Sequence, residues 1–192
     1  SGMQHIRAVL SDDIEIPAGI NTLQVSPEKE YDLGLQQKLI TFQSTDLGVA
    51  FLLEDQQKLI YHAGDLNDWV WEEESDSYNA EMTANYRRQI DLLSETLQHR
   101  EIDVAFVVLD PRQEKDYDRG LCYFLENISA KKVYQRLESV GDEESKFKID
   151  VENHGTNQIK IKPVREDKQI KRKPNLSVRL SFCLWVLYFI LI

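Results

Sequence analysis

Short runs of β-branched and aromatic residues, separated by turn residues, occupy the first third of the chain. Runs of four to eight such residues are typical of β-strands, and the polar residues Asp55-Gln56-Gln57 between the last two runs suit a hairpin connection. The predicted strands are Ile6–Leu10, Thr22–Val25, Lys38–Gln43, Val49–Glu54 and Lys58–His62.

The hydrophobic period changes between Asn79 and Leu97, where apolar residues recur every three or four positions. This spacing predicts an amphipathic helix, with Ser77 or Asn79 as the residue that caps its first turn. A continuous apolar run then predicts a strand buried on both faces, followed by a second helix and further strands. These elements are Val104–Leu109, the helix Leu121–Ile128, and the strands Lys131–Tyr134, Phe147–Val151 and Gln158–Ile161. The order predicts a layered α/β domain.

Charge divides the chain into two parts. The 192 residues are enough for about one domain, and the formal net charge of −10 argues against a surface built to bind nucleic acid. From Asn157 onward, however, eight Lys or Arg residues accompany two acidic ones. We therefore expect an acidic domain over residues 3–156 and a basic, then hydrophobic, tail over residues 157–192.

The N-terminal residues and the two cysteines indicate the cellular compartment of the protein. Ser1 and Gly2 precede Met3 as a tag scar would, and the three acidic residues within Gln4–Pro17 argue against a signal peptide. Two distant cysteines, Cys122 and Cys183, are too few for a disulfide framework. These features predict a cytoplasmic protein.

The last stretch, Leu180–Ile192, is apolar and follows the basic run Lys171–Lys173. A membrane-spanning helix needs roughly 20 apolar residues, which is more than this stretch contains. Three interpretations remain open: a short membrane anchor with the basic run at an anionic lipid surface, a buried terminal helix or strand, and the product of a shifted reading frame.

The segment Lys58–Trp71 is the most informative for chemistry. A strand ends in His62, Gly64 permits a tight turn, and Asp65 follows it. A carboxylate just past a strand end is placed to bind a hard cation in a cleft, whereas the alternative is that Asp65 caps the following turn. His62 is either a second metal ligand or a packed histidine at the end of the strand.

The segments Gly48–Glu54, Lys58–Asn67 and Ile102–Arg112 resemble the metallo-β-lactamase-fold hydrolases, particularly a bacterial lactonase-like branch. The resemblance covers roughly Ile6 to Tyr134. It implies a partial αββα sandwich with a mixed sheet and flanking helices, and one or two metal ions, usually zinc, that activate a bound water. Of the metal ligands usual in that family, the resemblance identifies Asp65 in this chain.

Other ligands of that family have no counterpart here. The His-x-His-x-Asp-His loop is missing, Asp46 stands where many members have a histidine, and Gln135–Glu138 stands where members present a final one. A catalytic zinc site needs about three protein ligands. The sequence therefore predicts an incomplete member, derived from a metal-dependent hydrolase and without independent hydrolytic activity.

Two other functions remain open. An incomplete sandwich exposes a sheet edge and an apolar face, which predicts a non-catalytic binding or self-assembly module that forms a homo-oligomer. The other alternative is that the chain is an active metal-dependent hydrolase that uses ligands outside the family pattern.

Two further groups near Asp65 have competing interpretations. Trp69 and Trp71 either wall a substrate pocket or act as packing elements. Arg112 either holds an anionic group at the mouth of a cleft or pairs with Asp110 or Asp116.

Overall fold

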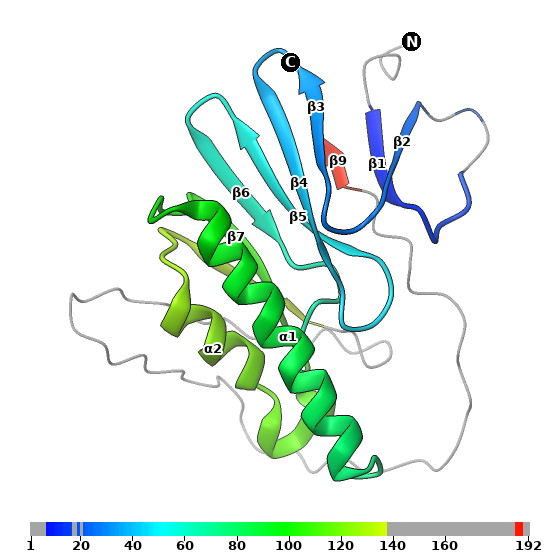
Figure 1. The fold of residues 1–192 in the computed structure, drawn as a ribbon, viewed down its shortest axis with the longest axis vertical. Helices are drawn as coiled ribbons and strands as arrows, with labels where there is room; N and C mark the ends of the chain where they lie inside the picture. The colour runs from blue at the N-terminus through cyan, green and yellow to red at the C-terminus, as the bar shows by residue number, and fades with distance from the viewer. Residues whose placement is uncertain (1–6, 17–18, 20, 138–186, 190–192) are drawn as a thin grey trace.

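A six-stranded mixed sheet forms the middle of the protein (Figure 1). The computed structural model describes residues 7–16, 19, 21–137 and 187–189. The first four strands of this sheet pair antiparallel with one another, and the last two continue the sheet with parallel pairing. In spatial order the strands are β3 (Glu30–Gly34), β4 (Gln37–Gln43), β5 (Val49–Asp55), β6 (Lys58–His62), β7 (Val104–Leu109) and β8 (Val133–Leu137).

A smaller sheet covers part of one face of the large one. It contains β1 (Arg7–Ser11), β2 (Thr22–Val25) and β9 (Leu187–Phe189), in the order β2-β1-β9. Val9 and Val25 pack against Leu39 and Phe51 of the large sheet. This apolar contact holds the two sheets face to face.

Two α-helices cover the opposite face of the large sheet (Figure 1). The long α1 (Asp76–Leu97) connects β6 to β7, and α2 (Arg119–Asn127) connects a 3₁₀ turn, η1 (Pro111–Asp116), to β8. Each of these connections joins parallel strands, which require a crossover. The core between helices and sheet includes Tyr61, Tyr86, Leu93 and Phe124, all at most 1% exposed.

The predicted α/β class, with a mixed sheet and flanking helices, is confirmed. Helices, large sheet and small sheet make three layers in that order, in agreement with a partial αββα sandwich. The sequence did not predict β3, because this edge strand alternates exposed and half-buried residues and ends in Asp32 and Gly34, which favour turns. The predicted strands Phe147–Val151 and Gln158–Ile161 lie outside the described residues.

The predicted cap of α1 is wrong. The capping residue is Ser75, whose hydroxyl accepts the backbone N–H of Tyr78 at 3.2 Å. Asn79 instead lies inside the helix and bonds to the backbone of Trp71 in both directions, with its Nδ2 2.9 Å from the carbonyl oxygen and its Oδ1 3.0 Å from the nitrogen. The helix therefore begins earlier and is anchored to the preceding loop.

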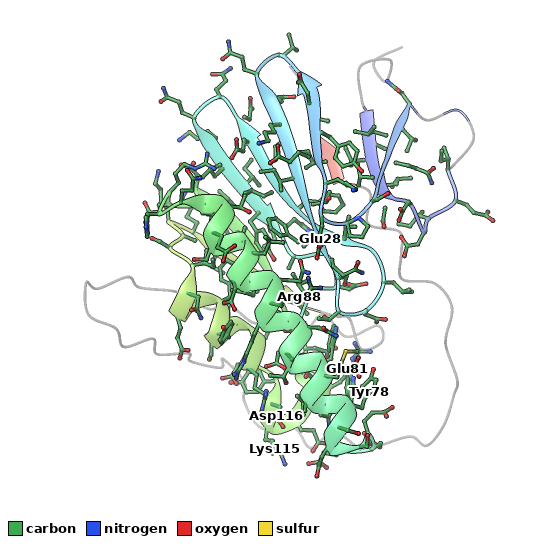
Figure 2. All side chains as sticks on the ribbon, viewed as in Figure 1. Glu28, Tyr78, Glu81, Arg88, Lys115 and Asp116 are labelled. Carbon is green, nitrogen blue, oxygen red and sulfur yellow. The ribbon has the colours of Figure 1, made fainter. Side chains whose placement is uncertain are left out.

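Polar contacts also join α1 to the turn before β3. Glu28 and Arg88 lie close together in Figure 2 and form an ion pair of 2.9 Å. Both side chains are exposed, so this pair adds little stability by itself.

The hydrophobic tail is described only at β9. There, Leu187–Phe189 pairs antiparallel with Arg7–Val9, so these three residues belong to a terminal strand. The remainder of Leu180–Ile192 lies outside the described residues. Within the described part of the chain, no helix is both long and apolar enough to cross a membrane.

Candidate functional site

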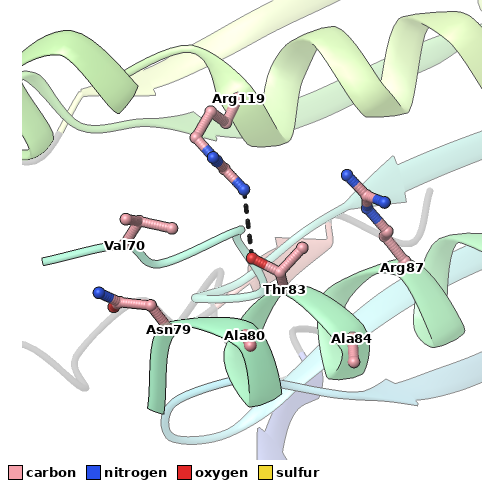
Figure 3. A pocket seen from close by; sticks show the side chains of 7 residues that line it. All are labelled: Val70, Asn79, Ala80, Thr83, Ala84, Arg87 and Arg119. Carbon is pink, nitrogen blue, oxygen red and sulfur yellow. Dashed lines mark hydrogen bonds between the residues drawn. The ribbon is translucent and has the colours of Figure 1, made fainter. Parts of the chain in front are cut away.

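An open groove runs between α1 and α2 (Figure 3). It has a volume of about 460 Å³ and is lined by residues of both helices and of the loop that follows β6. These residues are Val70, Asn79, Ala80, Thr83, Ala84, Arg87 and Arg119. The groove therefore combines small apolar side chains with two guanidinium groups.

The loop after β6, Ala63–Trp71, contributes Val70 to the groove and is itself largely buried. Leu66, Asn67 and Trp69 are at most 6% exposed. The backbone N–H of Ala63 donates to the carbonyl oxygen of Phe106 at 2.8 Å, which continues the pairing of β6 with β7. A loop buried to this extent must satisfy its polar groups within the protein.

Side chains from two other segments, in addition to Asn79 of α1, satisfy the loop's backbone. The hydroxyl of Thr45 donates to the carbonyl oxygen of Asn67 at 2.7 Å and accepts its N–H at 3.1 Å. The Oε1 of Gln113 accepts the N–H of Val70 at 2.8 Å. Two buried donors, Nδ2 of Asn67 and Nε2 of Gln113, have no hydrogen-bond partner among the described residues.

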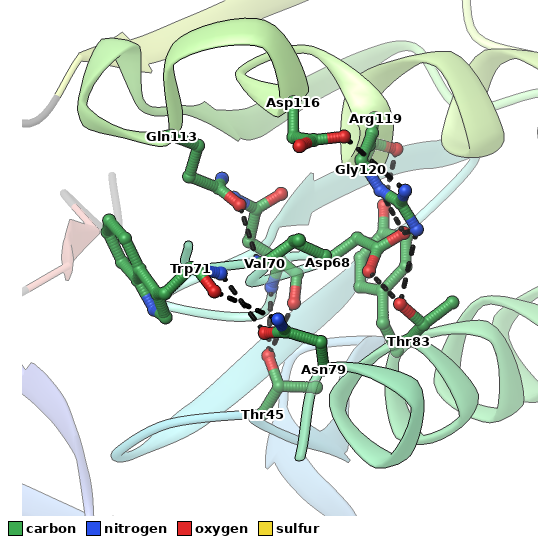
Figure 4. A network of polar contacts seen from close by, with 12 residues as sticks. Thr45, Asp68, Val70, Trp71, Asn79, Thr83, Gln113, Asp116, Arg119 and Gly120 are labelled. Atoms are coloured by element: carbon green, nitrogen blue, oxygen red, sulfur yellow. Dashed lines mark hydrogen bonds and ion pairs between the residues drawn. The ribbon is translucent and has the colours of Figure 1, made fainter. Parts of the chain in front are cut away.

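Asp68 is the charged centre of this network (Figure 4). Its side chain is 3% exposed, and its Oδ1 accepts the hydroxyl hydrogen of Thr83 at 2.6 Å. Its Oδ2 lies 3.3 Å from a guanidinium nitrogen of Arg119, which also approaches Asp116 at 3.4 Å. Burial of a carboxylate is costly unless such partners hydrogen-bond to it and pair with it. The sequence pattern did not identify Asp68, because its partner Arg119 is 51 residues away.

A second buried contact ties α1 to α2. Burial raises the pKa of the Tyr86 phenol, which therefore stays protonated and donates to the carbonyl oxygen of Gly120 at 2.6 Å. Burial likewise raises the pKa of the Cys122 thiol, which makes this cysteine a weak nucleophile.

The glycine of the predicted metal-site turn has a clear structural role. Gly64 has φ +58°, and a Cβ at this position would lie 2.5 Å from the carbonyl oxygen of Val49. Its backbone N–H donates to Nδ1 of His62 at 2.9 Å, so this nitrogen serves as an acceptor. The His62 ring lies against Phe106, with ring centroids 5.7 Å apart. His62 is thus packed at the end of β6.

Asp65 lies half-buried in the turn after β6, where the sequence predicts it. Its carbonyl oxygen accepts the indole N–H of Trp69 at 3.1 Å. Across the described ranges, no three or more His, Cys, Asp or Glu side chains come together in a way that could hold a metal ion. The described residues alone do not fit a catalytic zinc site, and metal binding by Asp65 and His62 stays a prediction.

The two tryptophans that follow Asp65 pack against each other, and the nearby Arg112 pairs with an aspartate. Trp69 is buried and stacks on Trp71, with ring centroids 5.7 Å apart and planes 7° apart. The Nε of Arg112 donates to both carboxylate oxygens of Asp110, at 2.8 and 2.9 Å, and its guanidinium lies 5.8 Å from the centre of the Trp71 ring. The predicted pairing of Arg112 with Asp110 is confirmed.

Comparison with known proteins gives a distant structural likeness. No protein-family model matches the sequence, and no curated protein matches it. Among solved structures, the chain is similar to CmlA, described as a diiron beta-hydroxylase from Streptomyces venezuelae, with 9% identity and a TM-score of 0.37. A variant of the CmlA beta-hydroxylase gives 9% identity and a TM-score of 0.38.

Each alignment covers 60% of this chain and 25% of the CmlA chain, so the present chain spans about a quarter of the length of those proteins. A likeness of this size assigns neither a family nor an activity to this chain.

Proposed function

We propose that this chain is a non-catalytic protein built on an incomplete metallo-β-lactamase-like scaffold. The observation that supports this proposal is that the polar groups of the loop Ala63–Trp71 are used in contacts within the protein. Its backbone is held by Thr45 and Gln113, and its most buried acid, Asp68, is held by Thr83 and Arg119. The polar groups of the loop thus stabilise the contact between sheet and helices.

The physical argument concerns what a hydrolytic metal site requires. Carboxylates and histidines must present free lone pairs to the ion. In this loop, Oδ1 and Oδ2 of Asp68 accept from a hydroxyl and a guanidinium, and at the end of β6 the Nδ1 of His62 accepts from Gly64. A cation bound by either oxygen of Asp68 would compete with a buried hydrogen bond or ion pair, and losing such a contact is costly in a region of low dielectric.

Metal content tests the proposal. The full chain is purified without chelator and its zinc, iron and manganese are measured by mass spectrometry, beside Asp65→Ala and the exposed control Glu73→Ala. We expect no stoichiometric metal in any sample and no turnover of lactone, phosphodiester or thioester substrates. A stoichiometric metal that is lost only in Asp65→Ala, together with turnover by the wild type, would establish the active hydrolase instead.

A second candidate function, self-assembly, has its own supporting observation. His62, Phe106 and Tyr134 are direct cross-strand neighbours on β6, β7 and β8. Phe106 and Tyr134 stack with centroids 5.6 Å apart, and Tyr134 is 50% exposed. This aromatic row lies on the face opposite the helices, beyond the apolar cluster that the small sheet covers. Exposed aromatic patches mark association sites.

A second copy of the chain is the proposed occupant of this row, because a two-fold axis would place the row against itself. Light scattering of the full chain over a wide concentration range tests this. We expect a dimer that Tyr134→Ser weakens and that Tyr78→Ser, an exposed control on α1, leaves unchanged. A monomer at every concentration would refute self-assembly.

A further inference from the structure

The groove between α1 and α2 holds two arginines with very different partners. Arg119 approaches Asp68, Asp116 and Thr83, with every distance between 3.3 and 3.4 Å. Arg87 instead places its guanidinium 5.0 Å from the centre of the Tyr123 ring, and no described carboxylate lies within ion-pair distance of it. One positive charge in the groove is therefore not neutralised by a described acidic residue.

Both guanidinium groups reach the same space. Figure 3 shows Arg119 extending from α2 toward Thr83, and Arg87 extending from α1 into the interval between the helices. Ala84 lies between Thr83 and Arg87 on α1, and its small side chain leaves this interval open. The cavity of about 460 Å³ lies within the range of small-molecule sites.

The chemistry of the lining defines a ligand class. Guanidinium groups bind oxyanions through charge-assisted hydrogen bonds, whereas Val70, Ala80 and Ala84 offer a small apolar surface. We propose that this groove binds a small organic oxyanion, whose anionic group is held by Arg87 and Arg119 and whose apolar body lies against Val70, Ala80 and Ala84. The site is separate from Asp65 and independent of the function proposed above.

The surrounding charges favour a monoanion. Asp68 and Asp116 already balance much of the charge of Arg119, which leaves Arg87 as the main source of uncompensated positive charge. Asp91, one turn from Arg87 on α1, accepts the hydroxyl hydrogen of Tyr123 at 3.1 Å and adds a negative charge nearby. A doubly charged phosphate would therefore meet more repulsion than a carboxylate. We expect benzoate to bind more tightly than phenyl phosphate.

Ligand-detected NMR titrations of the full chain test the site with benzoate, phenyl phosphate and the neutral control benzamide. Three variants accompany the wild type. Arg87→Met removes the charge and keeps the aliphatic stem, and Ala84→Leu fills the groove at an exposed helical position. Arg88→Met is the matched control, because Arg88 is also exposed on α1 but pairs with Glu28 outside the groove. A thermal melt of each variant establishes that it is folded.

We expect saturable benzoate binding that weakens about tenfold in Arg87→Met, as loss of a charge-assisted hydrogen bond predicts. Ala84→Leu should weaken it to a similar degree, and Arg88→Met should not change it. Tighter binding of phenyl phosphate than of benzoate would overturn the expected preference for a monoanion and would still support an oxyanion site. Equal binding to the wild type and Arg87→Met, equal binding of benzamide, or no saturable binding would overturn the proposal.

Discussion

The side chain of Gln89 on α1 donates from Nε2 to Oε1 of Glu28 at 2.8 Å, although 61 residues separate the two in the sequence. The same amide accepts the backbone N–H of Gln43 at 3.0 Å through its Oε1, and Gln89 is 1% exposed. One buried side chain thus links the helix layer to β4 and to the turn before β3.

We predict that Gln89→Leu destabilises the protein by about 1–3 kcal/mol, because it leaves the N–H of the half-buried Gln43 without its acceptor. Urea denaturation measures the change. The control Arg88→Ala removes only the exposed ion pair with Glu28 and should cost less than about 1 kcal/mol. Equal losses of stability in the two variants would show that the hydrogen bonds of Gln89 contribute no more than the exposed ion pair.

We predict that acid destabilises the fold partly through Asp103. A hydrogen bond from Lys131, a second from the backbone N–H of Leu59 and a third from Lys58 lower the pKa of Asp103 below its ordinary value of 3.8. Because the folded-state pKa is lowered, the stabilisation is present above that ordinary value and is lost as the pH falls through the folded-state pKa.

Thermal melts from about pH 7 to about pH 2 test this prediction. Asp103→Asn should lower the melting temperature at neutral pH and flatten its decline in acid. The exposed control Asp12→Asn should follow the wild-type curve. If the Asp103→Asn curve runs parallel to that of the wild type, Asp103 does not contribute to the acid sensitivity.

We predict that Gly120→Ala destabilises the protein by about 1–3 kcal/mol, against the usual preference of helices for alanine over glycine. A Cβ on Gly120 would collide with Oδ1 of Asn67 and would lie 3.1 Å from the backbone nitrogen of Asp68. Chemical denaturation of single and double variants measures the effect. Adding Asn67→Ala should recover part of the loss, because it removes the colliding amide. A stabilised Gly120→Ala would contradict the close approach of α2 to the loop.

We predict that Arg119→Met destabilises the protein by about 1–3 kcal/mol, because it leaves Asp68 buried with only Thr83 as its described side-chain partner. The expected loss is below that of a fully buried pair, since the Arg119 side chain is 37% exposed. Lys115→Met, at an exposed position of η1, is the control. If the free energy of unfolding of Arg119→Met lies within about 0.5 kcal/mol of the wild-type value, the burial of Asp68 does not require the charge of Arg119.

Local patterns determined most of the secondary structure. Each run of alternating or continuous apolar residues up to residue 137 corresponds to an observed strand, and the three-to-four spacing across Tyr86, Ile90, Leu93 and Leu97 corresponds to the buried face of α1. These features are predictable because burial of one face imposes a period on the residues of that element alone. The position of Asp65 in a tight turn at the end of β6 follows from a local feature as well, since the positive φ of Gly64 favours glycine there.

Contacts between distant segments were decided only by the tertiary structure. Ser75 caps α1 in place of Ser77 or Asn79, and the side chain of Asn79 instead bonds to the backbone of Trp71 in the loop before the helix. The partner of Asp68 comes from a helix that begins 51 residues later. The groove likewise exists only where the loop after β6, α1 and α2 meet. A sequence pattern records which face of an element is buried, whereas the identity of the groups that meet across an interface depends on how the elements pack.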